Sequence, residues 1–149
     1  MALKDLVIQS QLLPPRQRKG VLRRPRLDTL LAKVVDYPLT IVQAGTGYGK
    51  STALSSLADV VEHLFWYTIT EPDTDPLVFL AHLICSVDLH EPAWAAPALQ
   101  ALEESGGRVT PEVLTPLLNA LTANLESEAV LVLDDYHIVG DVPDIVELV

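Results

Sequence analysis

The chain has 149 residues, which is enough for one domain with a hydrophobic core and too few for two domains of ordinary size. Hydrophobic residues make up 49% and charged residues 20%, and this composition excludes a disordered chain. No apolar run approaches the roughly 20 residues of a membrane helix, and the first residues lack the apolar stretch of a secretory signal. The single cysteine, Cys85, cannot form an internal disulfide and fits a reducing compartment, so we expect a cytoplasmic protein.

The net charge of −10 is unevenly distributed. Eight of the ten basic residues lie within the first 33 positions, where only Asp5 and Asp28 oppose them. Residues 34–149 hold the other 18 acidic residues against Lys50 and Arg108, which gives this part a net charge near −16. Such a surface repels nucleic acid, so we expect no direct DNA binding by this chain. A more local role for the basic segment is to approach a bound polyphosphate.

Residues 1–25 are predicted to form a basic N-terminal arm, interrupted by Pro14, Pro15 and Gly20, and residues 26–149 to form the core. The helical spacing of apolar residues predicts a short amphipathic helix over 26–36. The β-branched segment Leu39–Gln43 predicts a buried strand. A glycine-rich turn and a helix over 51–63 follow it.

The second half of the core alternates in the same way. Apolar segments at 64–69 and 129–133 predict strands that are covered on both faces. Helices are predicted over 77–87, 93–104 and 110–124, the first capped by Asp75 with Pro76 at its first position. Strands that alternate with helices and are apolar throughout predict an α/β fold with a parallel sheet between two helical layers.

The segment from Ala44 to Ser51 fits the phosphate-binding pattern GxxxxGK(S/T), except that alanine replaces the first glycine. Gly45, Gly47 and Gly49 permit positive φ angles, so consecutive backbone N–H groups can surround phosphate oxygens. Lys50 can reach the β- and γ-phosphates, and the Ser51 hydroxyl is the expected Mg²⁺ ligand. The nucleotide-binding residues are therefore predicted to be Gly45, Thr46, Gly47, Tyr48, Gly49, Lys50, Ser51 and Thr52. A glycine turn with an incidental Lys-Ser pair is the alternative, but it does not explain why a strand precedes the turn and a helix follows it.

Asp134 and Asp135 follow an apolar strand, as a Walker B pair does. At the carboxyl end of a parallel strand, Asp134 can hold Mg²⁺ through water, and Asp135 can orient or deprotonate the attacking water. We therefore predict Asp135 and Lys50 as catalytic residues and Ser51 and Asp134 as the metal site. The alternative is a surface turn.

Other polar residues have simpler explanations. His137 could sense the γ-phosphate, but we favour a structural or solvent-facing histidine. Glu71, Asp73 and Asp75 could bind a cation, but we favour a solvated acidic loop. The remaining histidines show no metal-ligand spacing with Cys85.

Four segments together resemble one family: residues 12–27, 42–52, 71–83 and 131–137. Their order and spacing are similar to the start of the ATPase module of MalT-like regulators. These are the ATP-binding LuxR-type regulators among the signal-transduction ATPases with numerous domains (STAND). Ala44 and the Asp-Asp pair suit this family, whereas Gly45 in place of proline departs from it.

The resemblance implies a three-layer P-loop NTPase fold that binds ATP or ADP with Mg²⁺ and acts as a switch. It also implies that Arg24 and Arg26 lie against the adenine and ribose. In such proteins ATP and an inducer permit multimerisation, and output is often transcriptional. The expected partners are the remainder of the STAND module or a second copy of the chain. ATP hydrolysis is expected of the full module and is expected to be weak or absent in this chain.

The resemblance further implies that the chain stops after the Walker B strand, before a strand that lies between the Leu39–Gln43 and 129–133 strands. We therefore expect these two strands to pair directly, a second molecule to supply a strand, or the fold to be marginally stable. The rival function is a non-catalytic fragment that serves as an interaction or structural element. A small nucleotide kinase is rejected because Arg108 is the only basic residue after Lys50.

Overall fold

The computed structural model describes residues 2–15, 25–37, 40–42 and 49–149. Its α-helices are α1 (Pro25–Leu31), α2 (Lys50–Ser55), α3 (Pro76–Asp88), α4 (Pro92–Glu104), α5 (Thr115–Asn124) and α6 (Pro143–Val146). The strands are β1 (His63–Thr68) and β2 (Ala129–Asp134). Short 3-10 helices are η1 (Leu3–Leu6), η2 (Gln9–Leu12), η3 (Ala32–Asp36), η4 (Ser56–Asp59), η5 (Glu71–Thr74), η6 (Pro111–Leu114) and η7 (Tyr136–Ile138).

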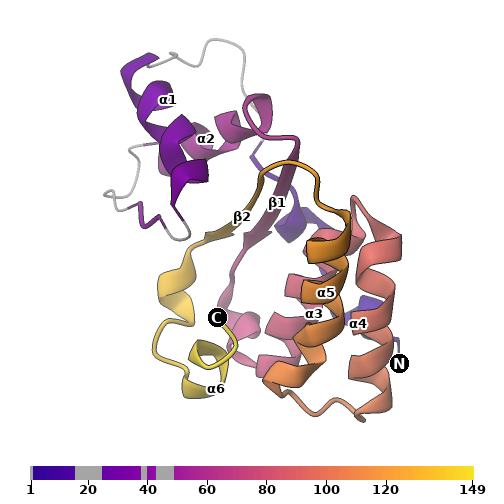
Figure 1. The fold of residues 1–149 in the computed structure, drawn as a ribbon. Helices are drawn as coiled ribbons and strands as arrows, with labels where there is room; N and C mark the ends of the chain where they lie inside the picture. The colour runs from indigo at the N-terminus through magenta and orange to yellow at the C-terminus, as the bar shows by residue number, and fades with distance from the viewer. Residues whose placement is uncertain (1, 16–24, 38–39, 43–48) are drawn as a thin grey trace.

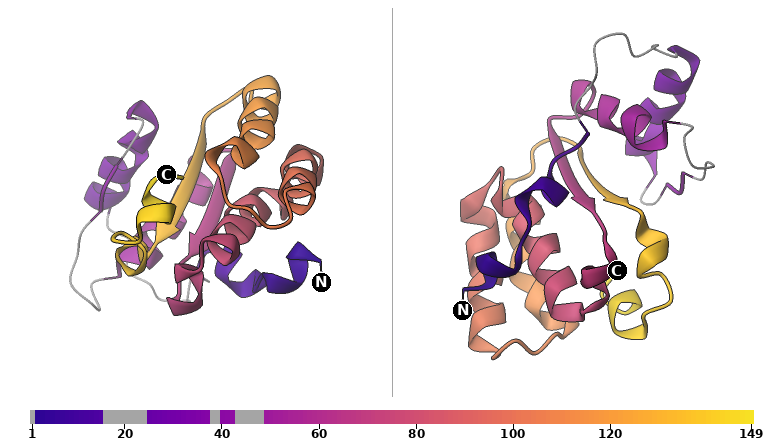
Figure 2. Two further views of the ribbon diagram at one scale, coloured as in Figure 1. Left: turned by 90° about the horizontal axis from the view of Figure 1, so that it is seen from below. Right: turned by 180° about the vertical axis from the view of Figure 1, so that it is seen from behind.

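The two strands form a parallel sheet with helices on both faces. β1 pairs with β2 from His63 opposite Ala129 to Thr68 opposite Asp134. Helices α3, α4 and α5 lie on one side of this sheet, and α1 and α2 lie on the other (Figure 1; Figure 2, left). The predicted parallel α/β arrangement with helices on both faces is confirmed for these two strands.

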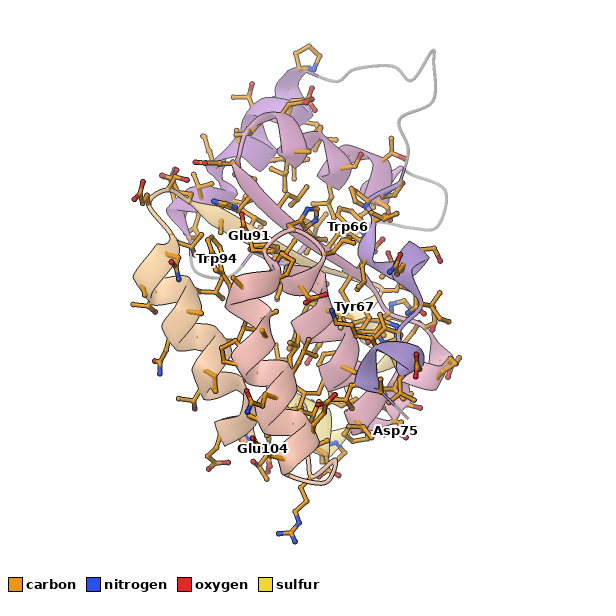
Figure 3. All side chains as sticks on the ribbon, turned by 90° about the vertical axis from the view of Figure 1, so that its right-hand side faces the viewer. Trp66, Tyr67, Asp75, Glu91, Trp94 and Glu104 are labelled. Carbon is orange, nitrogen blue, oxygen red and sulfur yellow. The ribbon has the colours of Figure 1, made fainter. Side chains whose placement is uncertain are left out.

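Two hydrophobic cores occupy the two faces of the sheet. Successive residues of a strand point to opposite sides, so Trp66 and Tyr67 belong to different cores (Figure 3). Tyr67 joins the larger core with α3, α4 and the N-terminal segment. Trp66 joins Leu54 and Leu57 of the α2–η4 segment and Leu31 of α1. Because both faces are apolar, neither strand shows a polar–apolar alternation.

Helix α3 is the central helix of the larger core. The Asp75 side chain accepts a hydrogen bond from the Leu77 backbone N–H at 2.9 Å, and Pro76 occupies the first turn, as the sequence predicts. The residues from Phe79 to Val87 are all buried. A helix buried on all sides is covered by neighbours all around; here they include β1, α4, η1 and η2.

The structure corrects the prediction of a strand at Leu39–Gln43. Within the described part of this segment, residues 40–42 adopt no strand, and Ile41 is 73% exposed. Direct pairing of this segment with β2 is therefore absent over residues 40–42, and the sheet of the described residues is β1–β2 alone. A strand gains its backbone hydrogen bonds only from a neighbour. These residues have no such neighbour.

Helix boundaries also differ from the predictions near the proposed site. The helix predicted over 51–63 is observed as α2 followed by η4, and it ends at Asp59. The helix predicted over 26–36 is α-helical only to Leu31 and continues as η3. The helix predicted over 110–124 begins as η6 before α5. In each case a 3-10 turn, which is common at helix ends, replaces part of the α-helix.

Candidate functional site

The candidate site lies where the start of α2 meets the end of β2. Gly49 precedes α2 with a φ of 70°, in the left-handed region that glycine adopts without strain. A Cβ atom at this position would meet nothing within 4 Å, so the backbone angle, rather than crowding, is what favours glycine. The chain then enters α2 directly at Lys50 and Ser51.

Asp134 is the best-positioned acidic residue of the site. It is 5% exposed and ends β2 on the same face of the sheet as Val130 and Val132, which is the face covered by α2. The Ser51 hydroxyl donates a hydrogen bond to Asp134 Oδ2 at 2.6 Å, across 83 residues of sequence. The separation is that of a strong hydrogen bond to a carboxylate.

Lys50 supplies the nearest positive charge. Its Nζ atom lies 3.9 Å from Asp134 Oδ1, which is too long for a hydrogen bond but close enough for electrostatic attraction. A buried carboxylate is costly without such partners. Asp134 is therefore held in the fold by a hydroxyl from one side and a partly exposed ammonium group from the other.

The backbone around Asp134 is fixed by β1. Thr68 is opposite Asp134 in the ladder, and the Ile69 N–H donates to the Asp134 carbonyl oxygen at 2.9 Å. The Thr68 hydroxyl in turn accepts a hydrogen bond from Trp66 Nε1 at 2.8 Å. Thr68 belongs to no sequence motif of the site. It could have been found from the rule that parallel strands end at a common edge of the sheet, where polar residues gather.

Asp135 lies in a different environment from Asp134. It has a φ of 59°, the only positive φ of a non-glycine residue among the described residues, and it is half-buried. Aspartate tolerates this conformation better than most residues. Its backbone N–H donates to Asp134 Oδ1 at 3.1 Å, so the turn helps to orient the Asp134 carboxylate.

The other predicted residues are placed as follows. Thr52 lies in the first turn of α2, and its carbonyl oxygen accepts a hydrogen bond from the Ser55 hydroxyl. Arg26 is exposed on α1, which packs against α2. His137 is exposed in η7. Arg24, Gly45, Thr46, Gly47 and Tyr48 lie outside the described residues.

The acidic segment at 71–75 is solvated at Glu71 and Asp75, as expected, but not at Asp73. Asp73 is fully buried, and its Oδ2 atom accepts hydrogen bonds from the Thr70 backbone N–H at 2.7 Å and from Gln11 Nε2 at 2.8 Å. Asp75 caps α3, as predicted. No group of three or more potential metal ligands occurs among the described residues. The buried Asp73 therefore has a structural role in the fold.

Comparison with known proteins identifies relatives that are transcriptional regulators. The HTH-type transcriptional regulator MalT of Vibrio cholerae serotype O1 is 31% identical over 136 residues, which cover 90% of this chain and 15% of that protein. MalT of Serratia proteamaculans is 29% identical and MalT of Yersinia enterocolitica 27% identical, each over 134 residues and with the same coverage. The chain therefore resembles one portion of these MalT regulators.

The similarity to MalT extends over most of the chain, but the chain spans only about 15% of the length of these regulators. The resemblance drawn from the four sequence segments is confirmed at this level. No protein-family model matches the chain, and no solved structure is significantly similar to it. Within the described residues, none of the helices is both long and apolar enough to span a membrane.

Proposed function

We propose that the chain binds ATP or ADP with Mg²⁺ at the 45–52 turn and provides the nucleotide switch of a STAND-type regulator. The observation that carries this proposal is the contact of Ser51 with Asp134. The sequence motif assigns both residues to the metal side of one site, although 83 positions separate them. An incidental glycine turn and an unrelated surface Asp-Asp turn have no reason to meet in this way.

The side chains present fit a Mg²⁺ ion. This ion prefers oxygen ligands and is usually held in nucleotide sites by one or two side chains together with phosphate oxygens and water. Ser51 and Asp134 supply a hydroxyl and a carboxylate that already lie 2.6 Å apart. When bound, the ion would neutralise negative charge on the phosphates.

The remaining residues have complementary roles in the proposal. Lys50 is partly exposed beside Asp134, so its ammonium group can turn towards a polyphosphate. Gly49 gives the backbone the conformation needed at the end of a phosphate-binding turn. Asp135 is the residue that we propose orients a water molecule in the full module, where slow ATP hydrolysis is expected.

A role in transcription regulation is proposed from the relatives. The proteins named MalT are HTH-type transcriptional regulators, and the chain matches a portion of each. We propose that this portion switches a larger regulator between states that differ in bound nucleotide. Such a switch works only if ATP and ADP bind the states with different affinities.

The proposal is tested by titrating ADP and ATP, each with Mg²⁺, into the wild-type chain and into Lys50→Ala. We expect Lys50→Ala to lose tenfold or more in affinity, equivalent to at least about 1.4 kcal/mol of binding free energy, because it removes the ammonium group next to the proposed phosphates. Lys33→Ala is the matched control, since Lys33 is exposed on η3. Equal affinity of wild type and Lys50→Ala, or no binding by wild type, would contradict the proposal.

A further inference from the structure

The N-terminal segment, residues 2–13, is packed onto the larger core. It runs along α3 and crosses β1 on the face opposite α2 (Figure 2, right). Leu3 and Leu12 are buried in this core, and Lys4 Nζ pairs with Asp88 Oδ2 at 2.9 Å. Without this segment, the core side chains beneath it would be exposed to water.

A buried polar cluster, formed by Gln11, Tyr67, Asp73 and His82, lies beneath this segment. All four residues are at most 7% exposed. Gln11 Nε2 donates to Asp73 Oδ2 at 2.8 Å and to the Thr68 carbonyl oxygen at 2.9 Å. The imidazole of His82 stacks on the Tyr67 ring, with centroids 5.2 Å apart and planes 6° from parallel, and Figure 3 shows Tyr67 in the interior of the molecule.

His82 is the second polar attachment point of the segment. Its Nε2 atom accepts a hydrogen bond from the Ile8 backbone N–H at 3.1 Å. A ring nitrogen that accepts a hydrogen bond carries no proton, so the proton of the neutral ring is on Nδ1. Nδ1 lies 2.9 Å from the Val78 carbonyl oxygen and 3.2 Å from Asp73 Oδ1, and both are acceptors.

We propose that His82 makes one attachment of the N-terminal segment dependent on protonation, so that the Ile8 N–H is held when the ring is neutral and is freed when the ring is charged. A second proton can be added only at Nε2, because Nδ1 already carries one. This proton would face the Ile8 N–H, so two donors would oppose each other and the hydrogen bond would be lost. The Ile8 N–H would then have no acceptor on the ring, and this attachment of the segment to α3 would be lost.

The neighbouring charges allow this protonation without loss of the whole fold. Asp73, from η5, lies on the Nδ1 side, where its carboxylate attracts an imidazolium but cannot accept the Nε2 proton. From β1 the titratable neighbour is Tyr67, whose pKa is raised by burial and by Asp73, so it stays neutral. The titratable residues from η1 and α3 are Lys4, Asp88 and Cys85. Lys4 and Asp88 form an ion pair, so their charges offset each other.

The remaining elements packed against α3 contribute only apolar residues to the buried core. These are Ala95, Ala98 and Leu102 from α4 and Ile145 from α6. Among the described residues, no buried charged side chain of α4 or α6 therefore competes with Asp73 for the His82 ring. Unperturbed histidine side chains change charge between about pH 5 and pH 8, so the test covers that range.

The test measures amide hydrogen exchange of the wild-type chain between pH 5 and pH 8, without nucleotide. Exchange rates are expressed as protection factors, so that the intrinsic pH dependence of exchange is removed. We expect the protection of the Ile8 amide to fall about tenfold on acidification, because its N–H loses its acceptor. The amides of β1 and β2 should keep their protection over the same range.

His82→Gln is the decisive variant. Its amide oxygen can accept from the Ile8 N–H at every pH, so the protection of Ile8 should no longer depend on pH. His90→Gln is the matched control, because His90 is exposed, and it should behave as wild type. Protection of Ile8 that is insensitive to pH in the wild type, or a pH dependence that persists in His82→Gln, would overturn the proposal.

A second measurement keeps the test valid if His82→Gln does not fold. The ring ¹⁵N chemical shifts of His82 are followed by NMR in the wild-type chain over the same pH range. We expect the Nε2 signal to titrate with the same midpoint as the loss of Ile8 protection. A His82 ring that does not titrate, or one that titrates while Ile8 stays protected, would overturn the proposal.

Discussion

Asp134 and Asp135 are neighbours in the chain, but their environments predict different roles. Asp134 is buried and bonded to Ser51, whereas Asp135 is half-buried in a left-handed turn. We expect Asp134→Asn to weaken Mg²⁺-dependent nucleotide binding about tenfold or more, because an amide is a poorer ligand for the ion than a carboxylate. Nucleotide affinities measured with Mg²⁺ and with EDTA would test this.

Asp135→Asn should preserve binding and abolish turnover in a longer, active form of the protein. The amide cannot accept a proton from an attacking water, but it keeps the size and the left-handed backbone preference of the aspartate. The comparison is a binding titration and an ATPase assay on the same sample. Hydrolysis at the wild-type rate by Asp135→Asn would show that Asp135 does not activate water.

Cys85 is a second residue whose environment makes a prediction. Burial on α3 raises the pKa of its thiol to about 11, from an ordinary value of 9.0, and the nearby Asp88 adds to the effect. Only the thiolate is a strong nucleophile. We therefore expect negligible alkylation by iodoacetamide at pH 8 in the native chain and rapid alkylation in urea.

The raised thiol pKa also fixes the sign of a pH effect on stability. The folded state favours the neutral thiol, so the contribution to stability is fully present below pH 9 and is lost as the pH rises towards 11. Cys85→Ala should remove this part of the alkaline loss. Rapid alkylation of the native chain at pH 8 would contradict the assignment.

Among the helices and strands, the sequence correctly predicts those whose limits are set by residues close by in the chain. α3 and α4 are found close to their predicted limits because Asp75, Pro76 and the glycines at 106 and 107 mark their ends. β1 and β2 are found because their apolar runs need cover on both faces. For the same reason the Ser51 and Asp134 positions could be paired in advance, since they belong to elements that meet at one edge of a sheet.

The elements that the sequence predicted less well depend on distant partners. Residues 40–42 have the composition of a strand but lack a neighbouring strand, and Thr40 and Ile41 are exposed, whereas Val42 is partly buried against the smaller core. Within the segment predicted as a basic arm, residues 1–25, residues 3–12 lie on the core through Leu3, Leu12 and Gln11. Its bond to His82 spans 74 residues of sequence, and no spacing rule predicts a contact of that kind.

The whole molecule has a sheet of only two strands among its described residues, and this limits its stability. The outer edge of β2 has no strand partner there, and Leu131 on this strand is 44% exposed. Ile41, in the segment expected to join the sheet, is 73% exposed. Strand edges with exposed apolar side chains are prone to pair with other chains.

We therefore expect the 149-residue chain to be marginally stable or to self-associate through the edge of β2. Its free energy of unfolding should lie near or below the lower end of the about 5–15 kcal/mol that is typical of single domains. Urea unfolding followed by circular dichroism at several protein concentrations would measure both properties. Sedimentation velocity on the same samples would report the oligomeric state.

Leu131→Lys tests whether unfolding that depends on protein concentration arises from association through the edge of β2. A lysine on an edge strand disfavours pairing with another strand, so this variant should be monomeric, and its unfolding should not depend on concentration. Leu118→Lys is the control, because Leu118 is 59% exposed on α5, away from the sheet edge, and it should associate as the wild type does. A strictly monomeric wild-type chain that unfolds cooperatively at high temperature would show that two paired strands suffice. In that case the exposed edge of β2 would carry no cost in stability.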